Sequence, residues 1–351
     1  MSKFRKMIRK VIPLRASVFE KSRIDLIRRI EQLQKRISRI EDKEKYLYKS
    51  AHEKNSIENF RVFRERSDFQ QCLIDLLKGL DEKSRATVIR ILKRQELVLE
   101  AEGLPLDIFS PDEQRRIKQL EERVKKGVLK VSDNCYCLED FMLPISKFEM
   151  SIVFDRHGVH MLGDTSRLRK REILDVGGFI GDSLPVLAPL TSGKVYSFEA
   201  DPHNFALLEQ TISMNGFSNV VPVQMALGDE DSVREFYSSG ACGGFSMPQT
   251  KVTEVITVPC ARLDTYLEDK SLDIGLIKVD IEGFEQAFLA GGKKTIEKHR
   301  PILLISIYHN PEDFFFIKPL IESWDLGYSF KIHKPLDKTI MRDLVLIAEP
   351  V

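Results

Sequence analysis

The chain has 351 residues, 42% of them hydrophobic and 30% charged, with a formal net charge of +1 at pH 7. This composition is typical of a folded, soluble protein and excludes a wholly disordered chain. No apolar run reaches the ~20 residues of a membrane-spanning helix, and the basic N-terminus lacks the apolar core of a signal peptide. We therefore expect a cytoplasmic protein.

The cysteines are scattered and odd in number, and none of them shows CxxC spacing: Cys72, Cys135, Cys137, Cys242 and Cys260. This pattern favours a reducing compartment and argues against a disulfide framework or a cysteine-based zinc site.

Residues 1–54 are predicted to form a basic amphipathic helix followed by a coiled coil. The first 50 residues carry 16 Lys and Arg against 6 Asp and Glu, and a heptad-like seam runs from Phe19 to Leu47. Such a seam has to pack against another helix, so we expect a homo-oligomer. The basic face suits an anionic membrane surface, which makes peripheral membrane contact a further expectation. The alternative is an intramolecular helix whose basic face is simply solvated.

Residues 55–130 are predicted to be a helical cap or spacer. Apolar side chains recur at helical spacing over 69–80 and again over 88–97. A third helix begins after Ser110, where Ser110 and Glu113 form a capping-box pattern. No residue in this segment indicates chemistry.

Residues 131–351 are predicted to form an α/β domain, because short β-branched runs alternate with helical patterns. Residues 143–154 are predicted to be a leading strand, with a hairpin turn at 155–158. A polar insertion at 229–260 is predicted to be a loop or hairpin over the carboxyl edge of the sheet. The predicted strands of the parallel sheet are Glu172–Val176, Lys194–Glu199, Val220–Ala226, Ile274–Asp280, Ile302–Tyr308 and Val345–Ala348.

A glycine-rich turn follows the first of these strands, with the sequence DVGGFIGDS from Asp175 to Ser183. Glycines let the backbone approach a ligand closely, and the N-terminus of the next helix offers free N–H groups. The turn lacks both the GKS/T of a phosphate loop and a GxGxxG pattern. Alone, it is compatible with a nucleotide, a dinucleotide or no ligand.

Glu199 ends the second predicted strand, 24 residues after Asp175. An acidic side chain at that position can accept hydrogen bonds from the hydroxyls of a ribose. The alternative is a surface glutamate that caps the following turn.

Three acids, Asp280, Glu282 and Glu285, follow the fourth predicted strand, and His309 follows the fifth. The carboxylates could orient a ligand, coordinate a divalent ion or act as a base. Glu285 is better explained as a residue in the first turn of the next helix, where its negative charge interacts favourably with the helix dipole. His309 is a candidate general base, although a lone histidine is more often structural.

Taken together, these segments resemble the FkbM family of methyltransferases. The segments that carry the resemblance, in chain order, are DVGGFIGDS, YSFEADPHN, MALGDED, ARLDTYL, IKVDIEGFE and ISIYHNPEDF. They cover about residues 143–348. The resemblance implies a class I methyltransferase fold, Rossmann-like with a seven-stranded mostly parallel sheet. It also implies S-adenosylmethionine as the methyl donor and O-methylation, often of sugars or polyketide-type products.

By the family's motifs, Asp175, Gly177 and Gly181 would hold the methionine end of the donor and Glu199 its ribose. The pair Met225-Ala226 would flank the adenine. The full set of predicted donor-binding residues is Asp175, Gly177, Gly178, Phe179, Ile180, Gly181, Glu199, Ala200, Met225 and Ala226.

The expected function is therefore an S-adenosylmethionine-dependent O-methyltransferase acting on a small-molecule or saccharide hydroxyl. His309 is the predicted base, with Asp280 or Glu282 orienting it or the acceptor; a divalent metal on these carboxylates is a second variant. One alternative is a non-catalytic scaffold that works through the coiled coil. An NAD-dependent oxidoreductase is disfavoured by the missing GxGxxG. A nucleic-acid partner is not expected, because no Asn/Asp-Pro-Pro-aromatic turn stands at Asp280.

Deleting residues 1–50 tests the role of the N-terminal arm. Loss of the heptad seam is expected to lower the mass in solution to that of a smaller oligomer, and loss of the basic face to reduce co-sedimentation with anionic liposomes. Light scattering and liposome sedimentation measure the two effects. Unchanged mass and unchanged liposome binding would leave the arm as an intramolecular helix.

Overall fold

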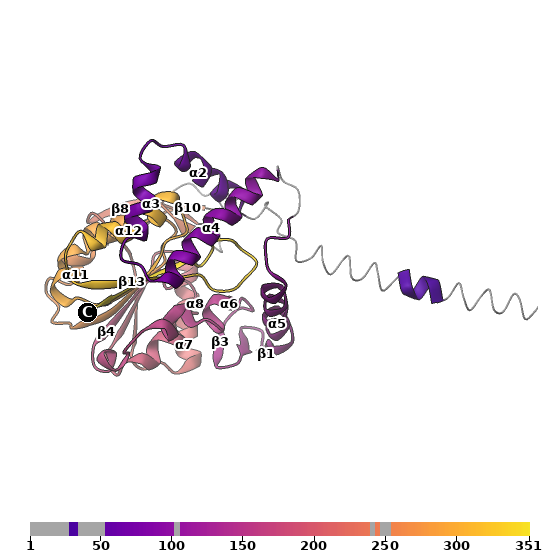
Figure 1. Ribbon diagram of the computed structural model, residues 1–351. Coiled ribbons are helices and arrows are strands. Elements are labelled where there is room, and N and C mark those ends of the chain that lie inside the picture. The colour runs from indigo at the N-terminus through magenta and orange to yellow at the C-terminus, as the bar shows by residue number, and fades with distance from the viewer. Residues whose placement is uncertain (1–27, 34–52, 102–105, 239–242, 246–253) are drawn as a thin grey trace, which may run out of the picture.

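The computed structural model describes residues 28–33, 53–101, 106–238, 243–245 and 254–351 (Figure 1). Most of the predicted N-terminal helix and coiled coil lies outside these residues, as do Cys242 and the tip of the polar insertion. Residues 28–33 are helical, with Ile30 and Leu33 exposed.

Helices occupy most of the segment predicted to be a helical cap or spacer. They are α2 (Lys54–Arg64), α3 (Phe69–Leu77), α4 (Glu82–Glu100) and α5 (Pro111–Gly127). The capping box at α5 is confirmed, since the Ser110 hydroxyl accepts from the Glu113 N–H and the Glu113 carboxylate accepts from the Ser110 N–H. Asp81 caps α4 in the same way, by accepting from the Ser84 N–H.

A seven-stranded sheet forms the centre of the molecule, in the order β13-β14-β12-β11-β4-β5-β6. Neighbouring strands pair in parallel from β6 to β12, whereas β14 pairs antiparallel with both β12 and β13. This confirms the predicted α/β fold with a mostly parallel seven-stranded sheet. The strands are β4 (Glu172–Val176), β5 (Val195–Glu199), β6 (Val220–Gln224), β11 (Ile274–Val279), β12 (Ile302–Ser306), β13 (Tyr328–His333) and β14 (Val345–Pro350).

Strand β13 was not among the predicted strands. It lies at the edge of the sheet, and among the strands of the described residues it pairs only with β14. Its sequence YSFKIH mixes polar and apolar residues. An edge strand that is half-buried carries a weaker apolar signal than the strands in the middle of the sheet.

The predicted leading strand over 143–154 and the hairpin at 155–158 are wrong. Strand β3 (Phe141–Leu143) ends before Pro144, and helix α6 (Met150–Val153) and a 3₁₀ segment (Arg156–Met161) follow. Phe148 and Ile152 are both buried and lie four residues apart, which is a helical period rather than the alternation of a strand. Strand β3 instead completes a small antiparallel sheet with β1 (Leu129–Ser132) and β2 (Cys135–Leu138).

The polar insertion contains a hairpin whose arms are β8 (Ser232–Ser238) and β10 (Glu254–Arg262), paired antiparallel. Strand β7 (Ala226–Gly228) pairs with β10 in parallel, and β9 (Gly243–Gly244) pairs with β8. This second sheet therefore begins directly after the end of β6.

Helices cover both faces of the main sheet. They are α7 (Leu184–Leu187), α8 (Pro202–Asn215), α9 (Leu263–Tyr266), α10 (Glu285–Gly291), α11 (Lys293–His299) and α12 (Pro311–Glu322), with 3₁₀ turns at Ser166–Leu168 and Ala188–Leu190. In Figure 1 the indigo helices α2–α4 lie over α12 and β13.

The N-terminal helices share one hydrophobic core with the sheet. Phe315 on α12 is fully buried and stacks on Phe63 of α2, with ring centroids 4.7 Å apart and an interplanar angle of 3°. Phe69 of α3 meets the same ring edge-on at 5.6 Å, and Phe60 packs against Phe314 at 5.3 Å. Such aromatic pairs add about 0.5–1.5 kcal/mol each beyond the burial of their area. The helical segment is therefore packed into the domain rather than tethered beside it.

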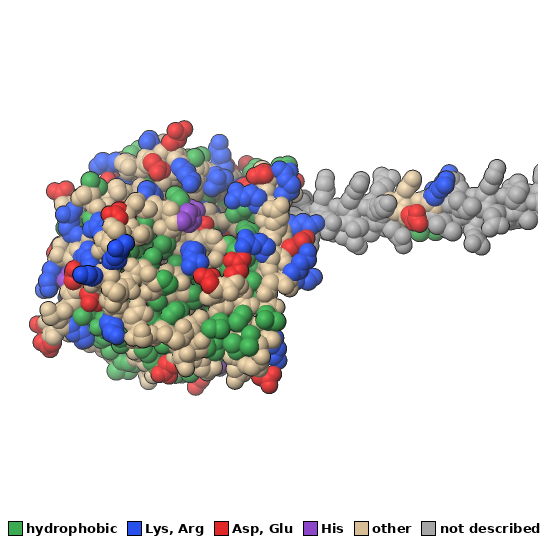
Figure 2. Space-filling view, turned by 90° about the horizontal axis from the view of Figure 1, so that it is seen from below, with side chains coloured by type: hydrophobic (Ala, Val, Ile, Leu, Met, Phe, Trp, Pro, Cys, Tyr) green, Lys and Arg blue, Asp and Glu red, His purple; other side chains and the backbone are tan. Residues whose placement is uncertain are grey.

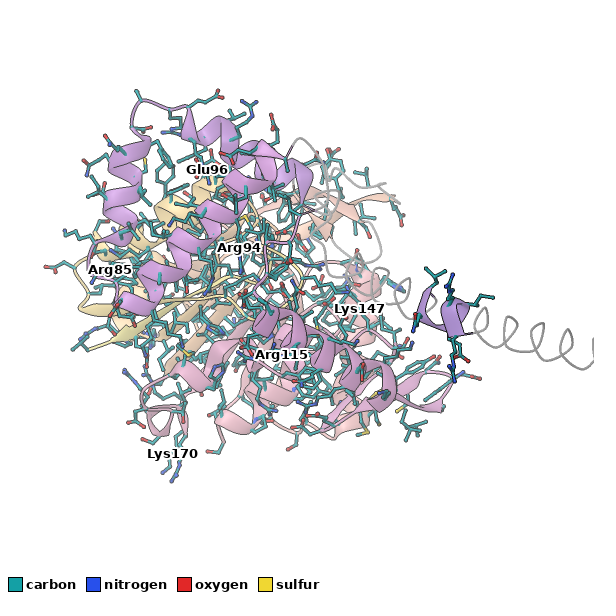
Figure 3. All side chains as sticks on the ribbon, turned by 45° about the vertical axis from the view of Figure 1, so that its right-hand side comes forward. Arg85, Arg94, Glu96, Arg115, Lys147 and Lys170 are labelled. Carbon is teal, nitrogen blue, oxygen red and sulfur yellow. The ribbon has the colours of Figure 1, made fainter. Side chains whose placement is uncertain are left out.

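Helices α4 and α5 are joined by an ion pair. A guanidinium nitrogen of Arg94 lies 2.6 Å from a carboxylate oxygen of Glu113, and both side chains are largely buried. Figure 3 labels Arg94 on α4 and, on α5, the exposed Arg115. The capping glutamate of α5 thus also attaches that helix to α4.

None of the described helices combines the length and the low charge that a membrane-crossing segment needs. Figure 2 shows one face of the molecule, on which basic and acidic side chains are intermixed and hydrophobic side chains are exposed between them.

Replacing Phe315 by Ala tests the shared core. The change removes a fully buried ring and its contacts with four other aromatic rings, so we expect a loss of about 3–5 kcal/mol in the free energy of unfolding. Urea unfolding followed by circular dichroism measures it. Ile74→Ala on the exposed face of α3 is the control, with an expected change within about 0.5 kcal/mol. Equal, small effects of both changes would mean that α2 and α3 do not share the core.

Candidate functional site

A cavity of about 160 Å³ opens at the carboxyl edge of the sheet, beside the ends of β4, β5 and β11. From β4 the chain continues to β5 on one side, whereas β11 flanks β4 on the other. Doubly wound proteins bind ligands at such a switch point. Of the predicted site residues, those on the cavity wall are Gly177, Phe179, Glu199, Ala200, Met225, Ala226, Asp280 and Glu282.

The glycine-rich turn packs directly against the turn after β11. Gly177 has φ +83°, and a Cβ atom there would lie 1.9 Å from the carbonyl oxygen of Asp280. The Asp280 N–H in turn donates to the carbonyl of Val176. Glycine is thus required at 177 so that the two turns can touch, and this contact sets the floor of the cavity.

Gly178, Ile180 and Gly181 do not line the cavity. A Cβ at Gly181 would lie 3.0 Å from Leu208 and Thr211 of α8, and a Cβ at Gly178 would lie 2.2 Å from the Ser197 hydroxyl oxygen. These two positions therefore allow α8 and β5 to pack closely against the turn. The side chain of Ile180 is buried in a separate apolar cluster.

Glu199 presents a buried carboxylate at the cavity wall. Its two oxygens accept from the N–H groups of Phe179 and Asp201, each at 2.8 Å. Burial raises the pKa of Glu199 to about 7, against the lowering effect of these hydrogen bonds. Nearby, the side-chain oxygen of Asn204 on α8 is buried at the wall without a hydrogen-bond partner in the described part of the chain. Both groups can accept from the hydroxyls of a ligand.

Asp175 lies beneath the cavity and forms a buried ion pair with Lys278 of β11, with Nζ 3.1 Å from Oδ1. The hydroxyls of Ser183 and Ser197 donate to its other oxygen. Lys278 also donates to the carbonyl of Gly177 at 2.6 Å. Burial disfavours the charged lysine, but the surrounding carboxylates, with Asp175 foremost, raise its pKa above the ordinary value. Asp175 therefore stabilises the turn from below.

His309 is enclosed by three carboxylates and does not line the cavity. Its Nδ1 lies 3.0 Å from Glu285, and its Nε2 lies 3.4 Å from Asp280 and 3.6 Å from Glu282. Burial opposes a charge on the ring, but the carboxylates of Glu285, Glu282 and Asp280 outweigh it and raise the pKa of His309 to about 10. The ring is thus an imidazolium at neutral pH.

Glu285 begins α10, as the sequence predicted, but its side chain is fully buried and faces His309. The donor atoms of Asp280, Glu285 and His309 lie within 4.8 Å of one another, a spacing that a divalent ion could bridge. A metal would have to displace the proton that the same carboxylates stabilise on His309. We therefore assign no metal to this cluster.

Comparison with known proteins identifies one domain within the chain. Residues 175–330 match the family model of the methyltransferase FkbM domain. The chain carries an FkbM methyltransferase domain. The match begins at Asp175, at the end of β4, and ends within β13, so it includes both turns that form the cavity floor.

Two relatives extend this result. The chain is 25% identical over 193 residues to the 2-O-methyltransferase NoeI of Sinorhizobium fredii, a match that covers 50% of this chain and 78% of NoeI. It also resembles the crystal structure of the methyltransferase FkbM from Methylobacillus flagellatus, with a TM-score of 0.51 and 19% identity over 80% of this chain. The present chain spans 58% of the length of that structure.

Part of the FkbM domain cavity is built by residues that the sequence did not single out. Residues from the segments before β4 and after β13 also line it, and neither segment carries a recognisable motif. Lys147, labelled in Figure 3, lies with its ammonium 4.3 Å from the ring centre of Phe179. Other cavity-lining residues that the sequence did not single out are Asp155, His157, Asp182, Asn204, Tyr308, Arg342 and Asp343.

The charge on His309 predicts a pH-dependent stability. Its pKa is raised from the unfolded value of 6.5 to about 10, so the stabilisation is complete below about pH 6.5 and is lost as pH rises through 10. We expect the free energy of unfolding of the wild type to fall between these limits by more than that of His309→Gln, which cannot titrate. Urea unfolding of both proteins across this range measures the difference. Parallel pH profiles would show that His309 is neutral in the folded protein.

Proposed function

We propose that this chain is an S-adenosylmethionine-dependent O-methyltransferase that acts on a hydroxyl of a sugar or saccharide. The observation that carries the proposal is the cavity wall at the end of β5, in an FkbM methyltransferase domain. There a buried carboxylate and an unpartnered amide oxygen, from Glu199 and Asn204, face the space beside the glycine-rich turn.

The wall fits the donor in hydrogen bonding. Glu199 and Asn204 would accept from the ribose hydroxyls, and Ala200, Met225 and Ala226 would flank the adenine. The backbone N–H of Phe179 donates a hydrogen bond to the Glu199 carboxylate, which keeps that carboxylate in place. When bound, S-adenosylmethionine supplies a methyl group already activated by a sulfonium centre.

The wall also fits the donor in charge. The basic side chains that line it are Lys147, Lys278 and Arg342, and Lys278 is neutralised by Asp175. Acidic groups outnumber them. Burial raises the pKa of Asp182 and Glu199 to about 7 and that of Asp343 to about 6, but the remaining carboxylates still favour a ligand with a net positive charge. The acidic lining residues are Glu149, Asp155, Asp182, Glu199, Asp280, Glu282 and Asp343.

The acceptor would lie against the carboxylates after β11. Asp280 and Glu282 can accept hydrogen bonds from hydroxyl groups, and Tyr308 already donates to Asp280 at 3.4 Å. Two carboxylates at one wall would hold a polyhydroxylated acceptor in a single orientation, and orientation is the largest contribution available to a transfer of this kind. The name of NoeI, a 2-O-methyltransferase, agrees with oxygen as the atom that is methylated.

In this proposal His309 is a positioning residue rather than the base that the sequence suggested. An imidazolium has no free electron pair with which to accept a proton, and the ring does not line the cavity. Its charge instead holds the carboxylates of Asp280 and Glu282 near each other. Burial favours a neutral Asp280, but His309 and Lys278 outweigh it and keep the pKa of Asp280 below its ordinary value.

The other functions considered for the sequence are less well supported. The family match and the open cavity argue against an NAD-dependent oxidoreductase and a non-catalytic scaffold. Oligomerisation and membrane contact through residues 1–54 remain proposals, because nearly all of that segment lies outside the described residues.

Replacing Glu199 by Gln tests the donor site. Gln keeps the size of the side chain but replaces one acceptor oxygen with an amide that faces a backbone N–H, so donor affinity is expected to fall by about 1–3 kcal/mol. Calorimetric titration with S-adenosylmethionine and S-adenosylhomocysteine measures it. Glu209→Gln, on the exposed face of α8, should bind as the wild type does. Wild-type affinity in Glu199→Gln, or no binding by the wild type, would refute the donor assignment.

A further inference from the structure

A second histidine, His157, lines the cavity and has no role in the function described so far. It lies at a kink within the segment Arg156–Met161 after α6, where His157 and Gly158 depart from helical geometry. Its Nε2 atom is shielded from solvent and has no hydrogen-bond partner among the residues that the structure describes. In the tautomer that carries its proton on Nδ1, this buried and unpartnered Nε2 is an acceptor available to a ligand in the cavity.

The backbone around His157 is held in an unusual conformation. Arg156, His157 and Gly158 have φ angles of 51°, 52° and 73°, in the left-handed region that non-glycine residues rarely adopt. Conformations of this kind persist where surrounding contacts enforce them. Here the Asp155 carboxylate, one residue earlier, lies 2.8 Å from Nε2 of His333 at the end of β13. The segment is thereby attached to the sheet with His157 directed at the cavity.

The charged groups around His157 come from three parts of the fold. They are Lys278 and Asp280 from β11 and its turn, Asp175 from β4, and Asp155 from its own segment. Burial, reinforced by Lys278, lowers the pKa of His157 to about 4 against the opposing effect of the carboxylates. The site therefore contains two histidines of opposite character: a charged ring behind the wall at His309 and a neutral ring on the wall at His157.

Resting on the function proposed above, we infer that His157 is the general base that takes the proton of the acceptor hydroxyl through Nε2. The acceptor oxygen forms its bond to the methyl carbon while the carbon–sulfur bond breaks and leaves its electron pair on sulfur. The hydroxyl proton passes to Nε2 of His157, and its O–H electron pair remains on the ether oxygen. No further reactant is needed.

This assignment also conserves the charge of the site. Transfer removes the positive charge of the sulfonium and creates one on the His157 ring, so the acidic wall faces one cation before and after the step. Asp280, Asp175 and Asp155 are the carboxylates near enough to affect that ring. A low proton affinity in the empty site suffices, because the hydroxyl becomes strongly acidic only as its oxygen bonds to the methyl group.

The first experiment compares His157→Asn with His160→Asn in the full chain. Asn tolerates the left-handed backbone at 157 and can hydrogen-bond but cannot take a proton, and His160 is an exposed residue of the same segment that does not line the cavity. The probes are S-adenosylmethionine as donor and glucose, galactose, mannose and their disaccharides as acceptors, with product detected by mass spectrometry. His157→Asn is expected to lose ~10²–10⁴-fold in turnover with unchanged affinity for the donor. His160→Asn should retain both.

A second variant separates proton transfer from structure. Glycine accepts the backbone of position 157 and leaves room for a small base, so free imidazole should restore part of the turnover of His157→Gly and none to His309→Gln. Turnover of His157→Asn at the wild-type rate, or failure of imidazole to rescue His157→Gly while the donor still binds, overturns the assignment of the base.

Nuclear magnetic resonance of protein labelled with ¹⁵N-histidine decides the protonation state without any acceptor. With the signals assigned by comparison with His157→Asn, the His157 ring is expected to be neutral at pH 7 with Nε2 unprotonated. A doubly protonated ring at pH 7 overturns the inference even if the enzyme is active. A wild type that binds no S-adenosylmethionine refutes the proposed function itself, and the base assignment with it. A wild type that binds the donor but methylates none of these sugars refutes only the acceptor class, and the ring spectrum then decides the base.

Discussion

At the carboxyl edge of the sheet, the ammonium group of Lys278 lies in contact with the carboxylate of Asp175 and with the carbonyl of Gly177. The lysine belongs to β11 and its two partners to β4 and the turn that follows, so one side chain joins the two strands at the point where the connections diverge. Both charged groups are almost completely buried. Removing one member of a buried ion pair leaves an uncompensated charge and typically costs about 3–5 kcal/mol. Because Lys278 also contacts the glycine-rich turn, this pair supports the contact of that turn with the turn after β11.

The positive charge of Lys278 also affects the protonation of the titratable groups that surround the cavity. Lys278 helps to keep Asp280 ionised and disfavours a second positive charge on His157, whereas the carboxylates around His309 favour one there. The pKa of one imidazole in this site is thus lowered and that of the other raised. Groups whose environments separate their pKa values in this way are suited to different tasks in one reaction.

Much of the fold could be read from the sequence, because buried parallel strands have strong apolar runs and a glycine-rich turn marks the first junction. The position of Glu199 on the cavity wall also follows from its place at the end of a strand. The orientation of His309 could not be read in this way. Whether a side chain after a strand points into the cavity or behind it depends on which neighbouring group it contacts. For His309 that group is the Glu285 carboxylate, and the sequence position of Glu285 suggested only the start of a helix. His157 lies in a segment predicted to be a hairpin, so no spacing rule placed it beside Asp280.

The reversed strand β14 lies in the interior of the sheet, between β12 and β13, although it is the last strand of the chain. The family match ends at residue 330, inside β13 and before β14 begins. A recombinant fragment cut to the matched residues would therefore lose the strand that connects β13 to the rest of the sheet. At its other end, such a fragment would lack the helices whose aromatic rings cover Phe314 and Phe315. The smallest unit that can be expected to fold alone is larger than the matched domain and begins no later than α2.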